Sequence, residues 1–220
     1  EDIKPDVMNV KEVLRIALPT TGGRLVGSIG YFFEPIFFTS AAVLAGISSS
    51  NIITQYGIIE GYVMPLLLLP GFFTNAISSA LLPVISNAYY NKRIDYVKKK
   101  LKQAILFSLL IGLPITIILF IFPEIFLKII YNTNEGVVYL RLIAPFFLLY
   151  YIQAPLSSTL QSINKAKYIM RDNAVSIIIK CLIIFVGSYF MGIYGFLISI
   201  CVNIIVVTFL HYKHVKKALK

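Results

Sequence analysis

Four charged side chains lie inside stretches of the sequence that are otherwise apolar enough to span a membrane. Arg24 and Glu34 lie in the first such stretch, Glu60 in the second and Lys180 in the fifth. An ionisable group at membrane depth costs about 2.5 to 3.5 kcal/mol, so it usually faces a protein interior or a water-filled cavity. The four charges therefore indicate a polar cavity, in which the cations could bind an anionic substrate and the acids could bind a proton or a cation.

The composition is that of an integral membrane protein. The 220 residues are 58% hydrophobic and only 14% charged, whereas charged residues make up about a quarter of a soluble domain. A bilayer core is crossed by about 20 apolar residues. We predict an all-α membrane fold with six transmembrane helices, over residues 13–45, 53–85, 101–122, 137–162, 173–190 and 193–212.

The basic residues predict the topology. Sixteen cations fall at the termini and in the loops that follow the second and fourth predicted helices, against two in the other loops. This asymmetry favours six crossings with both termini in the cytoplasm. It also accounts for the net charge of +10 without nucleic acid, which would need basic residues interleaved with aromatics on a soluble face. The basic run at residues 92–102 is expected to meet anionic membrane lipids.

The topology also gives approximate depths for the buried charges. Arg24 and Lys180 are expected on the cytoplasmic side, and Glu34 lies ten residues, or about 15 Å, further out than Arg24. Glu60 is expected near the height of Glu34. Two carboxyls in one apolar site do not both ionise easily, so one of them could carry a proton. In the alternative interpretation the cations snorkel to the interface and the acids bond to backbone groups freed by proline.

Glycine and proline suggest close packing and movement. Gly23 with Gly27, and Gly57 with Gly61, have the spacing that lets membrane helices approach each other. The first two predicted helices exceed one straight crossing and contain proline, so several helices are expected to be kinked. We assign hinges to three prolines, Pro35, Pro65 and Pro70, because broken helices are typical of secondary transporters.

Motifs for chemistry are missing from the sequence. It contains no Gly-rich nucleotide loop, no His-Glu-x-x-His pattern and no Gly-x-Ser-x-Gly elbow. His211 and His214 lie three residues apart among lysines, but two ligands make a poor metal site. Cys181 and Cys201 fall inside predicted helices and are expected to be packing residues. We therefore predict no enzyme activity, no metal and no cofactor.

Several segments resemble the polysaccharide-flippase branch of the multidrug/oligosaccharidyl-lipid/polysaccharide exporter superfamily, in particular its stage V sporulation group. They are "LRIALPTTGGRLVGSI" (14–29), "QYGIIEGYVMPLLLLPGFFTNAISSALLPVIS" (55–86) and "STLQSINKAK" (158–167), followed by Lys180. The third segment is similar to the Leu-Gln-Gly-x-Gly-Lys turn of the family, but Ser162 and Asn164 replace its glycines.

The resemblance implies one six-helix lobe of a two-lobe transporter in the bacterial cytoplasmic membrane. Residues 1–12 would be a linker from an N-terminal lobe, 13–212 the membrane lobe and 213–220 a basic cytoplasmic tail. The implied function is alternating-access flipping of a polyprenyl diphosphate-linked sugar for the cell wall, with the diphosphate held by Arg24 and Lys180 and coupling provided by Glu34 and Glu60. Two alternatives remain open: an ion-coupled drug or metabolite antiporter of the same superfamily, and a non-transporting membrane scaffold.

Overall fold

The chain folds into a helical bundle, seen here in a computed structural model that describes residues 7–220, apart from the side chains of residues 7–17, 19, 20, 23, 24 and 26. The elements in chain order are α1 (Val7–Leu44), α2 (Ser49–Ile58), the π-helical turn η1 (Ile59–Val63), α3 (Met64–Tyr90), α4 (Ile94–Ile121), α5 (Pro123–Tyr131), α6 (Val137–Ser162), α7 (Ala166–Met191) and α8 (Ile193–Ala218). Helices satisfy every backbone donor and acceptor internally, which lipid requires.

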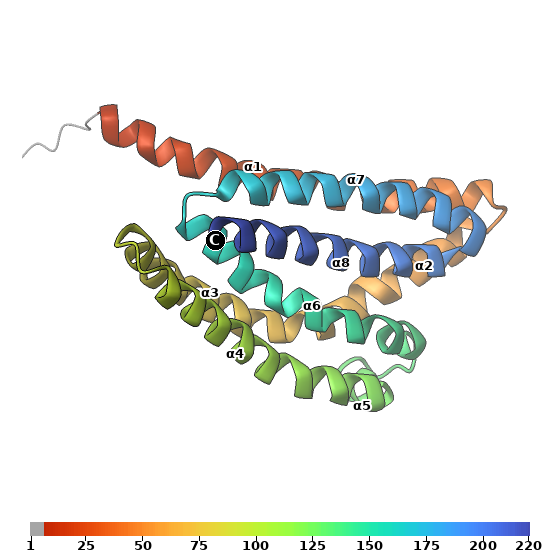
Figure 1. Cartoon of the computed structure of the whole chain (residues 1–220). Coiled ribbons are helices and arrows are strands. Elements are labelled where there is room, and N and C mark those ends of the chain that lie inside the picture. Colours follow the sequence, from red (N-terminus) through yellow and green to blue (C-terminus); the bar gives the residue numbers. More distant parts are fainter. Residues whose placement is uncertain (1–6) are drawn as a thin grey trace, which may run out of the picture.

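Six of these helical stretches are long and apolar enough to cross a membrane, with α2, η1 and α3 forming one continuous crossing over Ser49–Tyr90. The chain is therefore a multi-pass membrane protein, as predicted. Figure 1 shows that the described start of α1, the α3–α4 and α6–α7 turns and the C-terminus lie at one end of the bundle. The α1–α2 turn, α5 and the α7–α8 turn lie at the opposite end. We call these the basic end and the far end.

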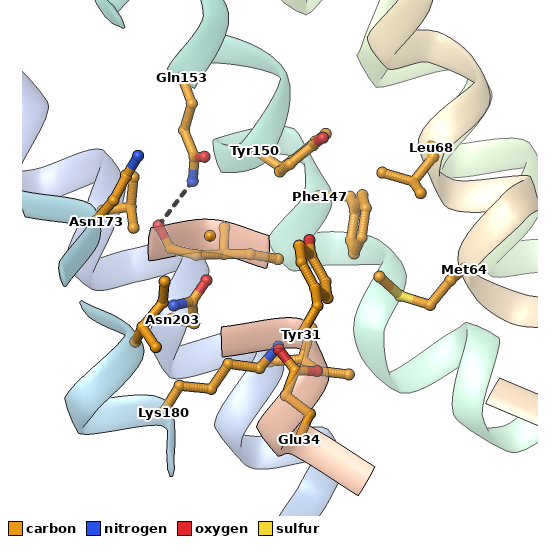
Figure 2. A pocket seen from close by; sticks show the side chains of 15 residues that line it. Tyr31, Glu34, Met64, Leu68, Phe147, Tyr150, Gln153, Asn173, Lys180 and Asn203 are labelled. Atoms are coloured by element: carbon orange, nitrogen blue, oxygen red, sulfur yellow. Dashed lines mark hydrogen bonds and ion pairs between the residues drawn. The ribbon is translucent and has the colours of Figure 1, made fainter. Parts of the chain in front are cut away.

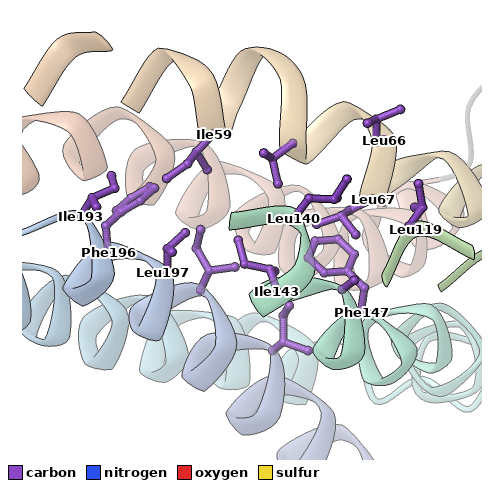
Figure 3. Close-up of a cluster of buried hydrophobic side chains, with 14 of the residues drawn as sticks. Ile59, Leu66, Leu67, Leu119, Leu140, Ile143, Phe147, Ile193, Phe196 and Leu197 are labelled. Atoms are coloured by element: carbon purple, nitrogen blue, oxygen red, sulfur yellow. The ribbon is translucent and has the colours of Figure 1, made fainter. Parts of the chain in front are cut away.

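The bundle has two layers that meet at α6 and α8. In one layer α1 packs along α7 and α7 along α8, and in the other α3 and α4 pack against α6. A buried apolar cluster joins the layers: Figure 3 shows Ile143 and Phe147 of α6 between Leu67 of α3 and Leu197 of α8. The hydroxyl of the fully buried Tyr151 donates a hydrogen bond of 2.7 Å to the Leu67 carbonyl. This contact fixes α3 on α6.

Several helices are longer than the sequence predicts. The 38 residues of α1 span about 57 Å at 1.5 Å per residue, well beyond a hydrocarbon core of about 30 Å. Helix α7 begins at Ala166 and not at residue 173, and α8 continues to Ala218, through most of the expected tail. The additional residues lie at the basic end and include polar side chains. A helix can continue there past its apolar stretch, because polar side chains are compatible with water and need no apolar partner.

Proline alters the helical pattern at one of the three assigned hinges. Helix α1 runs through Pro35, and α3 runs through Pro70. The second crossing changes to the π-helical turn η1 directly before Pro65. Proline clashes with the carbonyl four residues earlier, and a wider turn relieves that clash. π-Bulges often accompany functional sites, and this one contains Glu60.

The glycine contacts predicted from sequence spacing are wrong within the described part of the chain. A Cβ on Gly27, Gly57 or Gly61 would meet no atom within 4 Å. Close approach occurs elsewhere: a Cβ on Gly112 of α4 would lie 2.3 Å from the Tyr151 ring, and one on Gly195 of α8 would lie 2.0 Å from the Gly187 carbonyl carbon of α7. Small-residue spacing recurs by chance in glycine-rich helices, so it does not identify the contacting faces.

Replacing Gly195 by alanine should destabilise the protein by about 3 kcal/mol, at the upper end for overpacking, because its Cβ would meet backbone that has no side chain to rotate away. The matched control is Gly57→Ala, whose Cβ enters open space and should leave stability unchanged or raise it. Thermal melting of the purified protein in detergent measures both. Equal melting of the two variants would contradict the α7–α8 contact.

The departure from the family pattern at the α6–α7 turn has a backbone explanation. Asn164 adopts a left-handed conformation with φ of 59°, which only glycine and, less readily, asparagine or aspartate visit routinely. The turn closes through hydrogen bonds from the backbone N–H groups of Asn164 and Lys165 to carbonyls of α6. Asn164 thus provides the left-handed backbone conformation at a position where the similar family has glycine.

Candidate functional site

A cavity of about 190 Å³ opens between the two layers of the bundle. Five helical segments contribute to its wall, and Figure 2 shows their side chains converging on it. The polar or charged residues in the wall are Tyr31, Glu34, Tyr150, Gln153, Asn173, Lys180 and Asn203. A polar cavity in the middle of an apolar bundle is the feature that the buried charges predicted.

An ion pair between Lys180 of α7 and Glu34 of α1 forms one side of this cavity. The Lys180 ammonium donates a hydrogen bond to Glu34 Oε1, and the two residues are only 8% and 3% exposed. The ammonium also lies 5.4 Å from the centre of the Tyr31 ring, over its face. Taking both ions out of water costs several kcal/mol each, so the pair is a costly feature to place inside a membrane bundle.

The depth predicted for Lys180 is wrong. The sequence predicts a position on the cytoplasmic side, at the level of Arg24, because it predicts that the fifth helix begins at residue 173. In the structure Lys180 is fourteen residues into α7, about 21 Å along the helix. It lies eleven residues before Met191, and Glu34 lies ten before Leu44, so the two share one level. Because Lys180 is buried and paired, the snorkelling interpretation is also wrong for it.

The structure places the remaining predicted site residues as follows. Glu34 bonds to Lys180, and Glu60 is half-buried in η1 and does not line the cavity. Arg24 belongs to α1, but its side chain is outside the described part of the chain. Its predicted role as a substrate ligand stays a prediction, as do the coupling roles of the acids.

Amide side chains hold the helices around the cavity. Asn203 of α8 donates a hydrogen bond of 2.5 Å to the Ser176 hydroxyl of α7. Gln153 of α6 donates to the Ile204 carbonyl at 3.1 Å and to the Thr208 hydroxyl at 3.0 Å, both on α8. These bonds use the side-chain NH₂ groups and leave amide oxygens as acceptors. The cavity wall thus offers hydrogen-bonding groups without additional charge.

A second polar chamber of about 190 Å³ shares Tyr150, Gln153 and Asn173 with the cavity and ends at His211. His211 is only 3% exposed, and neither ring nitrogen has a hydrogen-bond partner among the described residues. A buried imidazole without a partner is costly. The chamber therefore continues the polar lining of the cavity to His211, a residue that the sequence analysis considered only as half of a poor metal site.

We predict that His211→Leu will not lower, and will slightly raise, the melting temperature, because it removes an unpartnered polar group. His214→Leu is the matched control, because His214 has two described partners and its loss should lower the melting temperature. A melting temperature of His211→Leu well below that of the wild type would contradict the absence of a partner for His211.

The sequence analysis also missed a buried cluster at the basic end. Asp172 is 1% exposed and accepts a 2.7 Å hydrogen bond from His214 Nδ1. Arg171 lies 2.8 Å from His214 Nε2, and because guanidinium groups only donate, Nε2 must accept. His214 is therefore a neutral ring that links Arg171 to Asp172, and Tyr168 stacks on it at 4.5 Å. The two histidines therefore have different surroundings: His214 has two described partners and His211 has none.

The spacing of polar residues on α7 and α8 could have identified His211 and Asp172 from the sequence. On α7 the buried residues Asp172, Ser176, Lys180, Ile184 and Ser188 recur every four positions. On α8 the buried Ser199, Val207 and His211 and the partly buried Asn203 have the same spacing. Residues four apart lie on one face of a helix. A mostly polar stripe on an apolar helix would have predicted the inward face of each helix.

Comparison with known proteins agrees with this architecture. The chain is 35% identical over 221 residues to "Stage V sporulation protein B" of Bacillus subtilis (strain 168), covering 100% of the chain and 43% of that protein. It is 30% identical over 212 residues to "Sporulation protein YkvU" of the same organism, covering 96% of the chain and 48% of that protein. The chain thus spans about half the length of the curated relatives it matches.

The fold is also that of solved transporter structures. One, described as "Crystal structure of MATE in the bent conformation", aligns with a TM-score of 0.81 and 18% identity over 99% of this chain and 47% of that chain. The family model described as MatE matches residues 28–186, which include α2 to α6, the C-terminal part of α1 and most of α7. On the strength of this match, together with the shared fold, the chain belongs to the MatE family.

Proposed function

We propose that the chain forms one lobe of an alternating-access transporter and that the cavity with Lys180 and Glu34 is part of the transport path. The observation that carries this proposal is the buried ion pair itself. A static membrane bundle gains little stability from such a pair. A protein with apolar residues of similar volume at the same positions is often as stable or more stable. Ionisable groups at membrane depth usually mark substrate or ion pathways.

We further propose that the transported molecule is a polyprenyl diphosphate-linked sugar of cell-wall synthesis. Lys180 supplies a cation for a diphosphate, while the amide oxygens and His211 supply hydrogen-bonding groups for a sugar. In the ion pair the charge of Lys180 is compensated by Glu34. An incoming diphosphate must therefore compete with the Glu34 carboxylate for the ammonium, with Arg24 as a further cation for the same group.

This competition suggests how binding could be coupled to a second ion. A proton or small cation on Glu34 would release Lys180 for the diphosphate, and the half-buried Glu60 is a second carboxyl that could take that ion. Glu60 lies in the π-helical turn before Pro65. A change of charge there would act on a hinge, to which Pro35 and Pro70 would also contribute.

The proposed arrangement in the membrane follows the positive-inside rule. The basic end of the bundle, with both termini, faces the cytoplasm of a bacterial cell, and the polyprenyl tail stays in lipid while the headgroup crosses the cavity. The second lobe would come from the N-terminal half of the same protein, joined through residues 1–12.

The test is binding of polyprenyl diphosphate-linked sugar to the two-lobe transporter in nanodiscs. The double variant Glu34→Gln with Lys180→Met removes the site without leaving a lone buried charge, and it should weaken binding at least tenfold. Glu34→Gln alone should tighten binding, because the ammonium no longer has a competing carboxylate. Lys128→Met is the matched control: it removes one exposed cation of α5 and should bind as the wild type does.

Other results would favour the alternatives. An ion-coupled antiporter for drugs or metabolites is the second candidate, because the carboxyls of Glu34, in the cavity wall, and of Glu60, half-buried in η1, could bind an organic cation. In that case the double variant would keep the lipid affinity and lose affinity for a cation such as tetraphenylphosphonium. If the double variant also kept full activity in cells, neither charge would serve transport and the scaffold interpretation would hold.

A further inference from the structure

A groove at the basic end, separate from the transport cavity, has an apolar floor and a cationic rim. Its volume is about 410 Å³ and it runs between α4 and α8, with Leu156 of α6 at its base. The apolar side chains are Leu101, Ile105, Leu156, Tyr212, Val215 and Leu219, and the cations are Lys98, Lys102, Lys216 and Lys220. None of these residues lines the cavity or the His211 chamber.

The four lysines are exposed and close together in pairs. Lys98 and Lys102 are one turn apart on α4, whereas Lys216 is in the last turn of α8 and Lys220 lies two residues past its end. Like charges four residues apart on a helix destabilise it, so an anion between the two pairs would relieve repulsion. The one acid described near them, Asp95, lies 3.8 Å from Lys98 and is itself fully exposed, so it compensates little of this charge.

The floor of the groove determines the kind of anion. Leu101, Leu156, Val215 and Leu219 belong to a buried apolar cluster at this end of the bundle, and Ile105 is partly exposed beside it. A soluble polyanion would leave the exposed parts of Ile105 and Tyr212 in contact with water. A molecule with an alkyl chain and an anionic headgroup would cover the apolar floor and meet the lysines at once.

The position of the groove matches the depth of lipid headgroups. It lies where α4 begins and α8 ends, at the end of the bundle that carries the α3–α4 turn and the C-terminus (Figure 1). Helix α4 leads from there directly into its apolar crossing. Lysines at the start of such a crossing reach the interface with their ammonium groups while their stems lie on apolar surface.

We propose that this groove is a binding site for one anionic bilayer phospholipid, with its phosphate between the two lysine pairs and an acyl chain on the apolar floor. Helices α4 and α8 each pack against α6, and the lipid fills the space between them. The bound lipid therefore acts as a clamp between the two layers of the bundle, and stability depends on the headgroup charge of the membrane.

The proposal is tested by native mass spectrometry of the delipidated two-lobe transporter titrated with phosphatidylglycerol, phosphatidylcholine and polyprenyl phosphate. Wild type should retain one phosphatidylglycerol with at least a tenfold preference over phosphatidylcholine. The groove variant, with Lys98, Lys102, Lys216 and Lys220 all changed to glutamine, should lose at least tenfold in affinity for phosphatidylglycerol. Ile105→Trp should lose a similar factor, because it fills the groove and keeps every charge.

The matched control changes four other exposed lysines of the same end, Lys92, Lys99, Lys213 and Lys217, to glutamine. It removes the same net charge and should keep the affinity within about twofold. An equal loss in the control would mean diffuse attraction to a basic surface and would overturn the proposal. Unchanged binding in Ile105→Trp would also overturn the proposal. Displacement of phosphatidylglycerol by polyprenyl phosphate at lower concentration would overturn it as well, and would assign the groove to the carrier lipid.

Discussion

Replacing Lys180 alone by methionine is expected to lower the free energy of unfolding by about 3 to 5 kcal/mol, the usual cost of leaving a buried charge without its partner. The carboxylate of Glu34 would remain, 3% exposed, with its counter-ion gone. Changing Glu34 to glutamine in the same protein should recover most of the loss, because a neutral amide has no ion to desolvate.

The measurement is thermal melting in detergent, followed through labelling of the free and partly buried Cys181 and Cys201. Arg141→Met is the control: Arg141 pairs with Glu124 at 2.9 Å, but both side chains are nearly half exposed, and such pairs contribute about 0 to 1 kcal/mol. If the double variant melted at the same temperature as Lys180→Met, the two residues would not act as a pair in the folded protein.

The second large effect is expected at the basic end, where Asp172→Ala should lower the free energy of unfolding by about 3 kcal/mol. The replacement deletes the acceptor for His214 Nδ1 and the acid nearest to Arg171, at 3.9 Å. Hydrogen bonds to charged groups contribute about 1.5 to 3 kcal/mol, and a buried donor left without a partner adds its own cost. Because the cluster joins α7 to α8, its loss should also separate these helices at that end.

Melting in detergent again gives the size of this effect, and Asp95→Ala is the matched control. Asp95 is an aspartate of the same end, but it is fully exposed and lies 3.8 Å from its lysine, so its replacement should leave the melting temperature unchanged. A mild effect of Asp172→Ala, no larger than that of Asp95→Ala, would mean that the His214 bond does not hold α7 and α8 together.

The two clusters differ in how far the sequence predicted them. Lys180 and Glu34 were recognised as charges inside apolar helices, yet their contact was not predicted, because the predicted start of α7 was seven residues too late. Asp172 was not recognised at all, since that same boundary left it in a loop. An error in one helix end thus changed the depth of one residue and hid the burial of another.

The choice of packing glycines shows a different limit. Gly57 and Gly61 have the spacing of a contact motif but face open space, whereas Gly187 and Gly195 meet across the α7–α8 turn. In a membrane the lipid-facing and the inward-facing side chains are both apolar. Hydropathy therefore says little about which face of a helix is buried, and spacing alone does not replace it.

The sequence by itself determined the membrane class, the number of crossings, the relation of charge to topology and the presence of ionisable groups that need a cavity, because the bilayer imposes length and charge rules on each segment separately. Only the tertiary structure decided that Lys180 meets Glu34, that His214 links Arg171 to Asp172, and that His211 is buried without a described partner. These contacts depend on the rotation and register of helices from distant parts of the chain, and the packing of the whole bundle sets both.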